Sequence, residues 1–407
     1  MHLKPITDKK TWNNFITLDN FPFYSFLWSW EWLDFKEDFW FPTLRFWVYD
    51  KNDNLVWLFP LIKTKAKRWT YLFAPHSPLI AVKSNALQVN SEKWIVKNNF
   101  EWWRNDRERW NSHAKLVSAS KKSNHEINSE WQIINSSGFS SASYFDVLEK
   151  ITPQLKEIAQ QEWASFIRLN PPVEATYQNY QNFKKLWFRN APIHEHAEDT
   201  HLLDLTPSEE ELFQNLKKKD RYLINRAIKE WVQIRIDNKP DHIETLIKMH
   251  QQHSKKVWYV PFSEKYIKNL YKHFWDNIRT ISTSYNWHVE SILITIKFNE
   301  TTSYYIAASE ITQKKFSPNY LAQRTAIKQA KQDWAKLYNF WWVSPDNNPK
   351  HPLHGVSDFK RKWGWYDFFL VHAQDLVVSP KYWVTWGIET LRRIKRGYYY
   401  VYPQNSI

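Results

Sequence analysis

The sequence predicts an α/β (α+β) chain made of two similar units in tandem, each with a mixed central sheet flanked by helices. Three observations predict this class. The length of 407 residues suits two domains of ~150 residues or more. Amphipathic helical segments alternate with short apolar runs of strand length. One order of elements (a strand, helices, a three-strand meander, a helix and a strand) occurs in both halves, which indicates a duplicated unit.

The first half begins with helices over residues 1–40, where apolar residues such as Trp30 and Leu33 lie near helical spacing. A meander follows, with the strands LRFWVYD, LVWLFPLIK and TYLFAP. Residues 84–142 are polar and poor in aliphatic runs, so we interpret them as an inserted excursion or lid. A helix over about 144–162 then leads into the strand ASFIRL.

The second half repeats this plan. After the strand HLLDL, a capping box with proline at the first helical position, TPSE, starts a helix that ends near Glu230. The remaining expected elements are the strand VQIRI, helices over about 241–256 and 263–274, the strands IRTISTSY, HVESILITIKF and TSYYIAAS, a helix over 319–333 and the strand KLYNFWWV. The motif AQQEWA at 159–164 matches AKQDWA at 330–335, each at the end of a helix.

These elements predict three segments of chain. Residues 1–192 form the first unit, with 84–142 inserted, and residues 193–367 form the second. Residues 368–407 are expected to return to the first unit.

Charge and cysteine content limit the function classes. Lys and Arg total 56 against 42 for Asp and Glu, a net charge of +14 that favours polyanionic partners. The absence of cysteine excludes disulfides, thiolate metal sites and cysteine nucleophiles. The N-terminus has no apolar signal core and no run reaches the ~18 residues of a membrane span. We expect a protein of the cytoplasm, either free or at the inner face of the membrane.

Glycine is too rare in this chain and tryptophan too common. At ~7% a chain of this length carries about 28 glycines, but here 5 glycines stand beside 26 tryptophans. Trp287 follows an asparagine between two apolar runs, in a hairpin position that needs positive φ. Four tryptophans follow a helix and precede a strand, where a left-handed glycine normally ends the helix: Trp163, Trp187, Trp231 and Trp334.

We therefore predict that most of these tryptophans stand for glycine in the cell, because some bacterial lineages read the UGA codon as glycine. Trp57, just after a turn, belongs to the same set. Trp32, Trp341 and Trp363 sit in apolar or motif contexts and are expected to be genuine. The alternative is an aromatic-rich protein that binds carbohydrate, although aromatic platforms have no reason to occupy turns.

The order of elements in each half resembles the GNAT acyltransferase fold, and three stretches resemble the Fem-type (FemABX) peptidoglycan bridge-forming aminoacyltransferases, which are paired GNAT-like proteins. The stretches are FLWSWEWLDFK (26–36), EDTHLLDLTPSEEELFQNLKKKDRYLINRAIKEW (198–231) and YNFWWVSPDNNPKHPLHGVSDFKRKWGWY (338–366). With Trp342 and Trp365 restored to glycine, the third is close to the family's C-terminal signature. The resemblance covers nearly the whole chain apart from 84–142.

Eight residues are candidates for the site. Lys219, Arg221, Tyr222 and Arg226 crowd one helix, where arginine offers bidentate phosphate contacts and tyrosine a hydroxyl donor. A solvated basic helix face explains them equally well.

The resemblance implies roles for the other four. Lys36 matches a lysine that contacts the nucleotide end of the precursor, and Tyr304 and Tyr305 match tyrosines that line the substrate channel. Lys360 matches a lysine near the reacting ester, where an ammonium offsets the oxyanion. Because strand neighbours alternate, we expect one of the two tyrosines to lie in the core.

The resemblance implies transfer of an amino acid from aminoacyl-tRNA to the side-chain amine of the stem peptide in a peptidoglycan precursor, either UDP-MurNAc-pentapeptide or lipid II. We expect direct aminolysis by a monomer, driven by positioning and oxyanion stabilisation, with no cofactor and no metal. The proton acceptor stays unassigned. The basic, aromatic C-terminal stretch LRRIKRGYYYVYP favours contact with tRNA or the membrane surface, or is a solvated helix end.

Three rival interpretations are weaker. An acyl-CoA-dependent GNAT N-acyltransferase needs a glycine-bearing pyrophosphate loop, and the matching stretch SPNYLAQRTAIK has no glycine and no tryptophan to convert. A non-enzymatic RNA- or glycan-binding protein requires the tryptophans to be real. The histidines His194, His196 and His201 mimic a metal cluster, but we find no carboxylate at ligand-like spacing to complete it.

Overall fold

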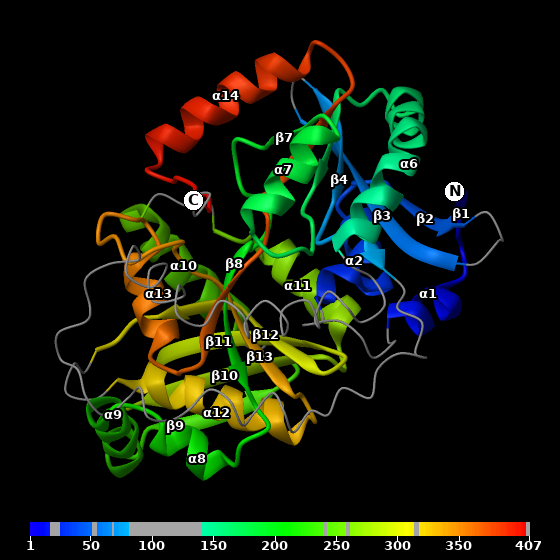
Figure 1. The fold of residues 1–407 in the computed structure, drawn as a ribbon. Coiled ribbons are helices and arrows are strands. Elements are labelled where there is room, and N and C mark those ends of the chain that lie inside the picture. The colour runs from blue at the N-terminus through cyan, green and yellow to red at the C-terminus, as the bar shows by residue number, and fades with distance from the viewer. Residues whose placement is uncertain are drawn as a thin grey trace, which may run out of the picture.

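The computed structural model describes residues 1–16, 25–50, 55–66, 69–80, 141–239, 242–257, 261–312 and 317–403. Two mixed sheets lie next to each other with helices on their faces (Figure 1), so the predicted fold class is confirmed. The predicted excursion at 84–142 lies outside the described residues, apart from its last two, which begin a helix.

The first sheet has the strand order β1-β2-β3-β4-β6-β15-β7, and β5 pairs with β3. Its strands are β1 (His2–Pro5), β2 (Thr43–Tyr49), β3 (Leu55–Lys65), β4 (Thr70–Ala74), β5 (Leu79–Ile80), β6 (Phe166–Leu169), β7 (Phe188–Asn190) and β15 (Gln374–Val377). The helices of this half are α1 (Lys9–Ile16), the 3₁₀ turn η1 (Phe26–Trp28), α2 (Trp30–Glu37), α6 (Ser141–Gln161) and α7 (Tyr177–Lys185). Helix α6 packs on the sheet because Leu148, Ile151 and Leu155 recur every three or four residues and are fully buried.

The second sheet has the order β14-β8-β13-β12-β11-β10-β9. Its strands are β8 (Asp199–Asp204), β9 (Gln233–Asp237), β10 (Ile278–Tyr285), β11 (His288–Phe298), β12 (Thr301–Ser309), β13 (Leu337–Trp342) and β14 (Tyr366–Phe369). Its helices are α8 (Glu209–Gln214), α9 (Lys218–Lys229), α10 (Ile243–Val257), α11 (Glu264–Phe274), α12 (Pro318–Gln332) and α13 (His354–Arg361). The expected capping box is present: Ser208 and Glu211 cap each other's backbone at the start of α8.

The two sheets have the same wiring. In each, a three-strand antiparallel meander is followed by a helix and a parallel strand, so that β6 lies beside β4 and β13 beside β12. In each, the next position is filled by a strand from a distant part of the chain. β15, which follows the second half in the sequence, lies between β6 and β7. β8, the first strand of the second half, lies between β13 and β14.

These pairings bear on the predicted segments of chain. The boundary near residue 192 falls between β7 and β8, and the boundary near 367 falls inside β14. The division itself stays a prediction.

Most buried apolar side chains of the described residues belong to three clusters. One cluster, including Phe59 and Ile167, lies between the first sheet and helices α6 and α7. A second, including Ile224 and Ala326, joins the second sheet to α9 and α12. The largest cluster joins residues of both sheets, such as Ile62 on β3 and Ile294 on β11. The two halves are therefore held together by a shared apolar core.

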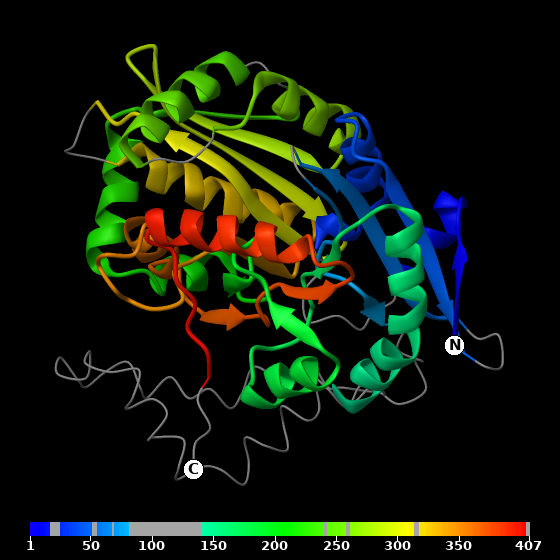
Figure 2. The ribbon, with the colours of Figure 1, turned by 90° about the horizontal axis from the view of Figure 1, so that it is seen from above.

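The last helix, α14 (Tyr382–Lys395), lies across the outside of the molecule after β15 (Figure 2). None of the helices in the described part of the chain is long and apolar enough to cross a membrane.

Tryptophan occupies left-handed backbone at eight described positions, with φ between 57° and 85°. Six of these side chains are more than four-fifths exposed. At two equivalent helix ends Ala164 N donates to Ala159 O (2.7 Å) and Ala335 N to Ala330 O (2.9 Å), the bonds of a Schellman turn. The eight positions are Trp40, Trp163, Trp187, Trp231, Trp287, Trp334, Trp341 and Trp365.

The left-handed conformation expected at the four helix ends and at the hairpin is present, and these are positions that favour glycine. Two expectations differ from the structure. Trp57 is fully buried in β3 and is not among the residues with positive φ, so that site has no need of glycine. Trp341, expected to be genuine, has φ 64° because β13 carries an extra residue there. The recoding itself stays a prediction.

Candidate functional site

A cleft of about 450 Å³ lies where the two halves meet. The first half contributes Lys36 from α2 and Tyr71 and Phe73 from β4. The second half contributes Tyr266 from α11, Tyr305 from β12, and Trp341 and Trp342 from β13. Glu195 and His196 come from the connection between β7 and β8. The cleft is therefore walled by aromatic rings and holds one ammonium and one carboxylate.

Lys36 supplies the positive charge. Its Nζ lies 4.6 Å from the ring centre of Trp32 and 5.8 Å from that of Phe41, as cation–π contacts. Burial lowers the pKa of Lys36 to about 8, and the nearby Glu195 carboxylate opposes that shift. At neutral pH the side chain is therefore mostly protonated. Burial, aided by the charge of Lys36, holds the pKa of His196 well below its ordinary value, so this ring is neutral.

Glu195 supplies the negative charge and is held from behind. Its Oε1 accepts hydrogen bonds from the Tyr71 hydroxyl (2.9 Å) and from Arg168 Nη1 (3.2 Å). Arg168 is fully buried and also pairs with Asp375 (2.7 Å) and Glu389 (2.8 Å). This network fixes the carboxylate of Glu195 at the cleft wall while its side chain stays 23% exposed.

Two β-bulges shape the wall formed by the second sheet. Opposite β11, residues Ile306 and Tyr304 take consecutive partners, which leaves Tyr305 as the extra residue of β12. Opposite β8, the register of β13 shifts between Asn339 and Trp342. A bulge redirects side chains, and bulges are frequent beside active sites. Here the Tyr305 hydroxyl lies 2.5 Å from that of Tyr266 at the cleft.

Tyr304 and Lys360 lie together behind this wall. Tyr304 packs 6.3 Å from Phe340 in the outer core, so one tyrosine of the pair is a core residue, as alternation predicts. Lys360 on α13 is 5% exposed, with Nζ 5.4 Å from the Tyr304 ring. That Nζ donates a 2.7 Å hydrogen bond to Trp342 O. Burial lowers the pKa of Lys360 to about 7.

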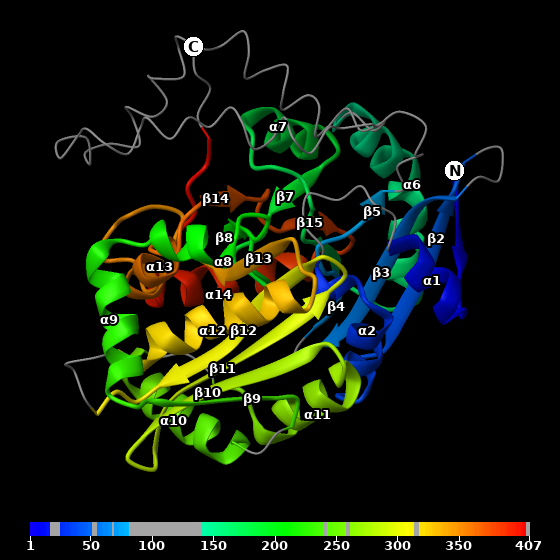
Figure 3. The same ribbon diagram turned by 90° about the horizontal axis from the view of Figure 1, so that it is seen from below.

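The structure does not bring the basic helix to this cleft. Helix α9 lies at the outer edge of the second half, far from α2 (Figure 3). Tyr222 and Lys219 are exposed there, and Arg226 bonds to Tyr222 (2.9 Å) and to Glu230 (3.1 Å). Arg221 donates to the carbonyl oxygens of Gln214 and Leu216. The substrate-binding role expected for Lys219, Arg221, Tyr222 and Arg226 stays a prediction that this cleft does not use.

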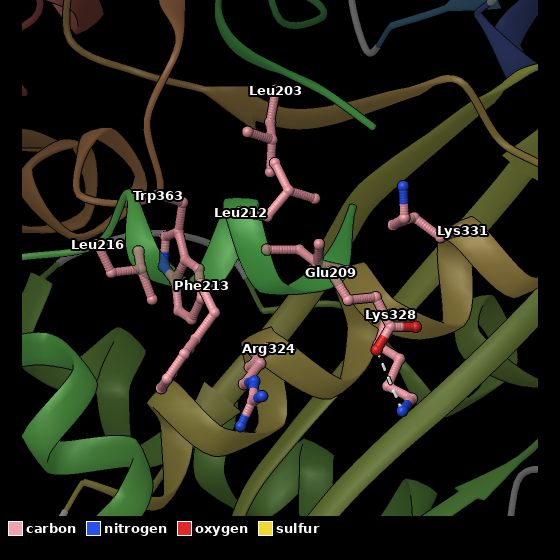
Figure 4. A pocket seen from close by; sticks show the side chains of 10 residues that line it. Leu203, Glu209, Leu212, Phe213, Leu216, Arg324, Lys328, Lys331 and Trp363 are labelled. Atoms are coloured by element: carbon pink, nitrogen blue, oxygen red, sulfur yellow. Dashed lines mark ion pairs between the residues drawn. The ribbon is translucent and has the colours of Figure 1, made fainter. Parts of the chain in front are cut away.

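A second, small groove lies between α8 and α12 (Figure 4). Its charged groups already have partners. Lys328 pairs with Glu209 at 3.1 Å, and Arg324 stacks 4.1 Å from the Phe213 ring centre. Lys331 donates to the carbonyl oxygens of Leu205 and Pro207. We regard the groove as a packing seam between the two helices.

A buried histidine–carboxylate cluster links the connection between β7 and β8, which carries His194 and Glu198, to the connection between β14 and β15, which carries His372. Glu198 Oε2 accepts hydrogen bonds from His194 Nδ1 (2.5 Å) and His372 Nδ1 (2.9 Å). Its Oε1 accepts from Asn170 Nδ2 and Ala373 N, both at 2.8 Å. The two imidazoles hold the pKa of Glu198 well below its usual range against the effect of burial.

The sequence argument that no carboxylate completes a histidine cluster is therefore wrong. His194, Glu198 and His372 offer ligand atoms within 4.8 Å of one another and are the described residues that could hold a metal. The carboxylate of Glu198 already accepts four hydrogen bonds. Without a metal, the cluster is therefore a complete hydrogen-bonded link between the β7–β8 and β14–β15 connections.

Sequence reasoning missed Glu195, Tyr71 and Tyr266 as cleft residues. Glu195 stands between two histidines in the stretch PIHEHAED, and that concentration of polar groups between two strands was the available signal. Tyr71 and Tyr266 had none, because a tyrosine in a strand or an amphipathic helix looks like an ordinary core residue.

The wiring of the two sheets defines the class of fold: two similarly wired mixed sheets in tandem, the fold of the FemX crystal structure. Within that class, residues 282–388 match the model of the FemAB family. The matched segment is roughly a quarter of the chain and contains Tyr305, Trp342 and Lys360. The resemblance to Fem-type proteins predicted from the motifs is confirmed on this segment. No curated protein sequence matches the chain.

One of the matching solved structures supports the fold. The crystal structure of FemX matches with a TM-score of 0.68 at 14% identity, over 96% of this chain and 100% of that one. Two others match more weakly. A tandem GNAT protein from the clavulanic acid biosynthesis pathway has 9% identity, coverages of 92% and 99%, and a TM-score of 0.47. A conserved protein of unknown function from Bacteroides thetaiotaomicron has 12% identity, coverages of 92% and 99%, and a TM-score of 0.49.

Proposed function

We propose that this protein is an aminoacyltransferase that moves an amino acid from aminoacyl-tRNA to the side-chain amine of the stem peptide in a peptidoglycan precursor. The cleft carries the proposal, because it combines residues of the FemAB-matching segment with an ammonium and a carboxylate from the rest of the chain. Such a cleft suits a substrate that presents both a phosphate and a primary amine.

Lys36 is the phosphate-binding group in this proposal. Its ammonium faces the cleft beside aromatic rings and forms no ion pair with the described residues. A phosphate of the precursor would complete its charge balance. On the same cleft wall the hydroxyls of Tyr266 and Tyr305 are bonded to each other, so one of the two keeps a proton to donate to the phosphate.

Glu195 is the group that receives the acceptor amine. A primary amine with an ordinary pKa of ~10 arrives as an ammonium and must lose a proton before it can attack. The fixed carboxylate of Glu195 binds that ammonium and takes this proton. The amine nitrogen then bonds to the ester carbonyl carbon, and the bond from that carbon to the tRNA ribose oxygen breaks. The ribose oxygen takes the second proton and leaves as a hydroxyl.

Lys360 acts from behind the wall. Its ammonium is bonded to the carbonyl of Trp342, which lines the cleft. In this arrangement Lys360 holds the β13 bulge in place and adds positive potential where negative charge develops on the ester oxygen. Lys360 is therefore a positioning residue. If residue 342 is glycine in the cell, as the recoding predicts, its backbone carbonyl still accepts this hydrogen bond, and the cleft wall has no side chain at that position.

The reaction is tested with radiolabelled aminoacyl-tRNAs and UDP-MurNAc-pentapeptide, using the printed sequence and a form with glycine at the left-handed tryptophans. Label on the peptide would support the proposal and identify the amino acid. Label on lipid II alone would change the acceptor and keep the reaction. Acetyl-CoA with the same peptide tests the rival acyl donor. No transfer from tRNA to either precursor would overturn the proposal.

The role of Glu195 is tested with Glu195→Gln, which keeps the shape but not the charge. We expect kcat to fall by roughly 10²-fold, the scale of a lost general base. The matched control is Glu162→Gln, which removes a partly exposed carboxylate paired with Lys63 outside the cleft. An unchanged kcat for Glu195→Gln in an active enzyme would remove Glu195 from the chemistry and leave the reaction intact.

A further inference from the structure

Helix α14 presents an apolar stripe to solvent. Trp383, Val384, Leu391 and Ile394 are 47%, 60%, 69% and 65% exposed. At 3.6 residues per turn these four positions fall within roughly 100° of arc. The opposite side of the helix is the packed one, where Tyr382, Thr385 and Glu389 are buried. The helix therefore turns a continuous apolar stripe outward, the reverse of an ordinary surface helix.

The flanks of this stripe are basic. Lys381, Arg392, Lys395 and Arg396 are all exposed on α14 or at its ends. The acidic residue of this helix, Glu389, is 4% exposed and paired with Arg168 at 2.8 Å. No acidic side chain on α14 thus reaches the surface to balance these cations.

Tryptophan recoding does not remove the stripe. Trp383 and Trp386 lie within the right-handed helix and are not among the residues with positive φ. Glycine inside a helix costs roughly 1 kcal/mol relative to alanine. Next to Gly387, glycine at both positions would weaken α14, so these tryptophans fit as they are printed.

We propose that α14 docks on a bilayer surface that carries anionic phospholipid. Aliphatic side chains gain from burial at the acyl boundary, tryptophan suits the interface, and the flanking cations pair with the headgroups. With 14 residues the helix lies on such a surface and does not span it. Nucleic acid is a poorer match, because valine, leucine and isoleucine offer it neither stacking nor hydrogen bonds. A second copy of a chain with charge +14 would bring the same cations face to face.

The stripe joins the cleft through one side chain. Arg168 contacts Glu389 on the inner side of α14 and Glu195 at the cleft. Docking of α14 would therefore hold the cleft near the bilayer surface. The helix that makes this contact is tied to the cleft by the ion pairs of Arg168. The inference stands apart from the proposed transfer reaction, because vesicle binding is measured without substrates.

The test is co-sedimentation of the full chain with vesicles of phosphatidylcholine containing 30% phosphatidylglycerol, and with vesicles of phosphatidylcholine alone. We expect binding to the anionic vesicles that weakens with salt. The double variant Leu391→Ser/Ile394→Ser should lower partitioning by more than tenfold. Arg392→Gln/Lys395→Gln/Arg396→Gln should lower it roughly a hundredfold. The matched control, Ile228→Ser/Lys229→Gln on the surface of α9, should bind as the parent does.

A second measurement locates the contact. The chain has no cysteine, so Leu391→Cys can carry a single environment-sensitive dye, with Ile228→Cys as its control. A blue shift at 391 and none at 228 is expected with anionic vesicles. Absence of vesicle binding, equal binding to both vesicle types, or binding untouched by the α14 variants would overturn the proposal. So would tRNA binding or dimer formation that depends on the same residues without vesicle binding.

Discussion

The two sheets share one wiring but differ where their parallel strands meet. In the first sheet, β4 and β6 pair in an unbroken register and β6 pairs with β15 without a shift. In the second, the equivalent strands β12 and β13 each carry an extra residue. The first sheet instead buries a charged network around Arg168. One duplicated plan thus gives unbroken pairing around β4 and β6, beside the carboxylate of Glu195, and bulged strands in the cleft wall formed by the second sheet.

The difference suggests a division of roles between the halves. Regular pairing in the first sheet keeps Tyr71 and Glu195 in fixed positions. The bulges of the second sheet place Tyr305 at the cleft and leave Tyr304 in the core. Duplicated units commonly keep the packing and change the site.

The largest expected effect is on the ion network of the first sheet. Arg168→Leu should lower the free energy of unfolding by about 3–5 kcal/mol, because it leaves buried carboxylates unpaired. The deficit should shrink as pH falls, because burial already raises the pKa values of Asp375 and Glu389 and protonation removes their charge. Urea unfolding at two pH values measures both.

The matched change in the second sheet is Tyr338→Phe, which lies on β13, the strand that corresponds to β6. It removes the hydrogen bond from Gln323 (2.8 Å) and should cost about 1 kcal/mol. If the two variants lost similar free energies of unfolding, the buried charges of the first sheet would matter no more to stability than the neutral hydrogen bond of the second.

Lys360→Met should have the next largest effect, on turnover. Loss of an electrostatic group of this kind costs about 10²–10³ in kcat. The free fraction of an acceptor amine rises with pH, while Lys360 loses its charge near pH 7. The wild-type rate should therefore level off near pH 7, and the rate of the variant should keep rising. A parallel profile in both proteins would show that Lys360 is structural.

Stability gives an independent check on Lys360. Its pKa in the folded protein lies below the ordinary value, so between pH 7 and ~10.4 the unfolded chain holds more protons. The wild type should gain stability as pH rises over that window. Lys360→Met should lack this gain, which thermal unfolding between pH 6 and 9 measures.

The smallest expected effects are at the equivalent helix ends of the two halves. Trp163→Gly and Trp334→Gly should each stabilise the fold by about 1 kcal/mol, because φ values of 57° and 63° strain an L-residue. Trp383→Gly, inside right-handed α14, should destabilise it by a similar amount. Sequencing the gene decides the origin of these residues: UGA at 163 and 334 is expected, and UGG at both would rule out recoding.

The sequence carries the fold better than the site. Periodicity and capping predict α6, α8 and α12, and the repeated AQQEWA and AKQDWA stretches predict the duplication. The spacing of residues along the chain does not predict which distant segments pair or pack together. Glu195, which is held by the first sheet, and Tyr305 of the second sheet line one cleft because the shared core holds the two halves together. For the same reason the sequence gives no sign that α9 lies at the outer edge of the second half, away from this cleft.

The place of β15 in the first sheet has a consequence for how the chain is made. The gap beside β6 stays open until residues 374–377 leave the ribosome, long after residues 166–169 have done so. The first half therefore emerges first but is completed last, with Arg168 waiting for Asp375 and Glu389. A nascent chain that stalls before β15 exposes a bare strand edge and an unpaired buried charge, which marks it for chaperones or proteolysis.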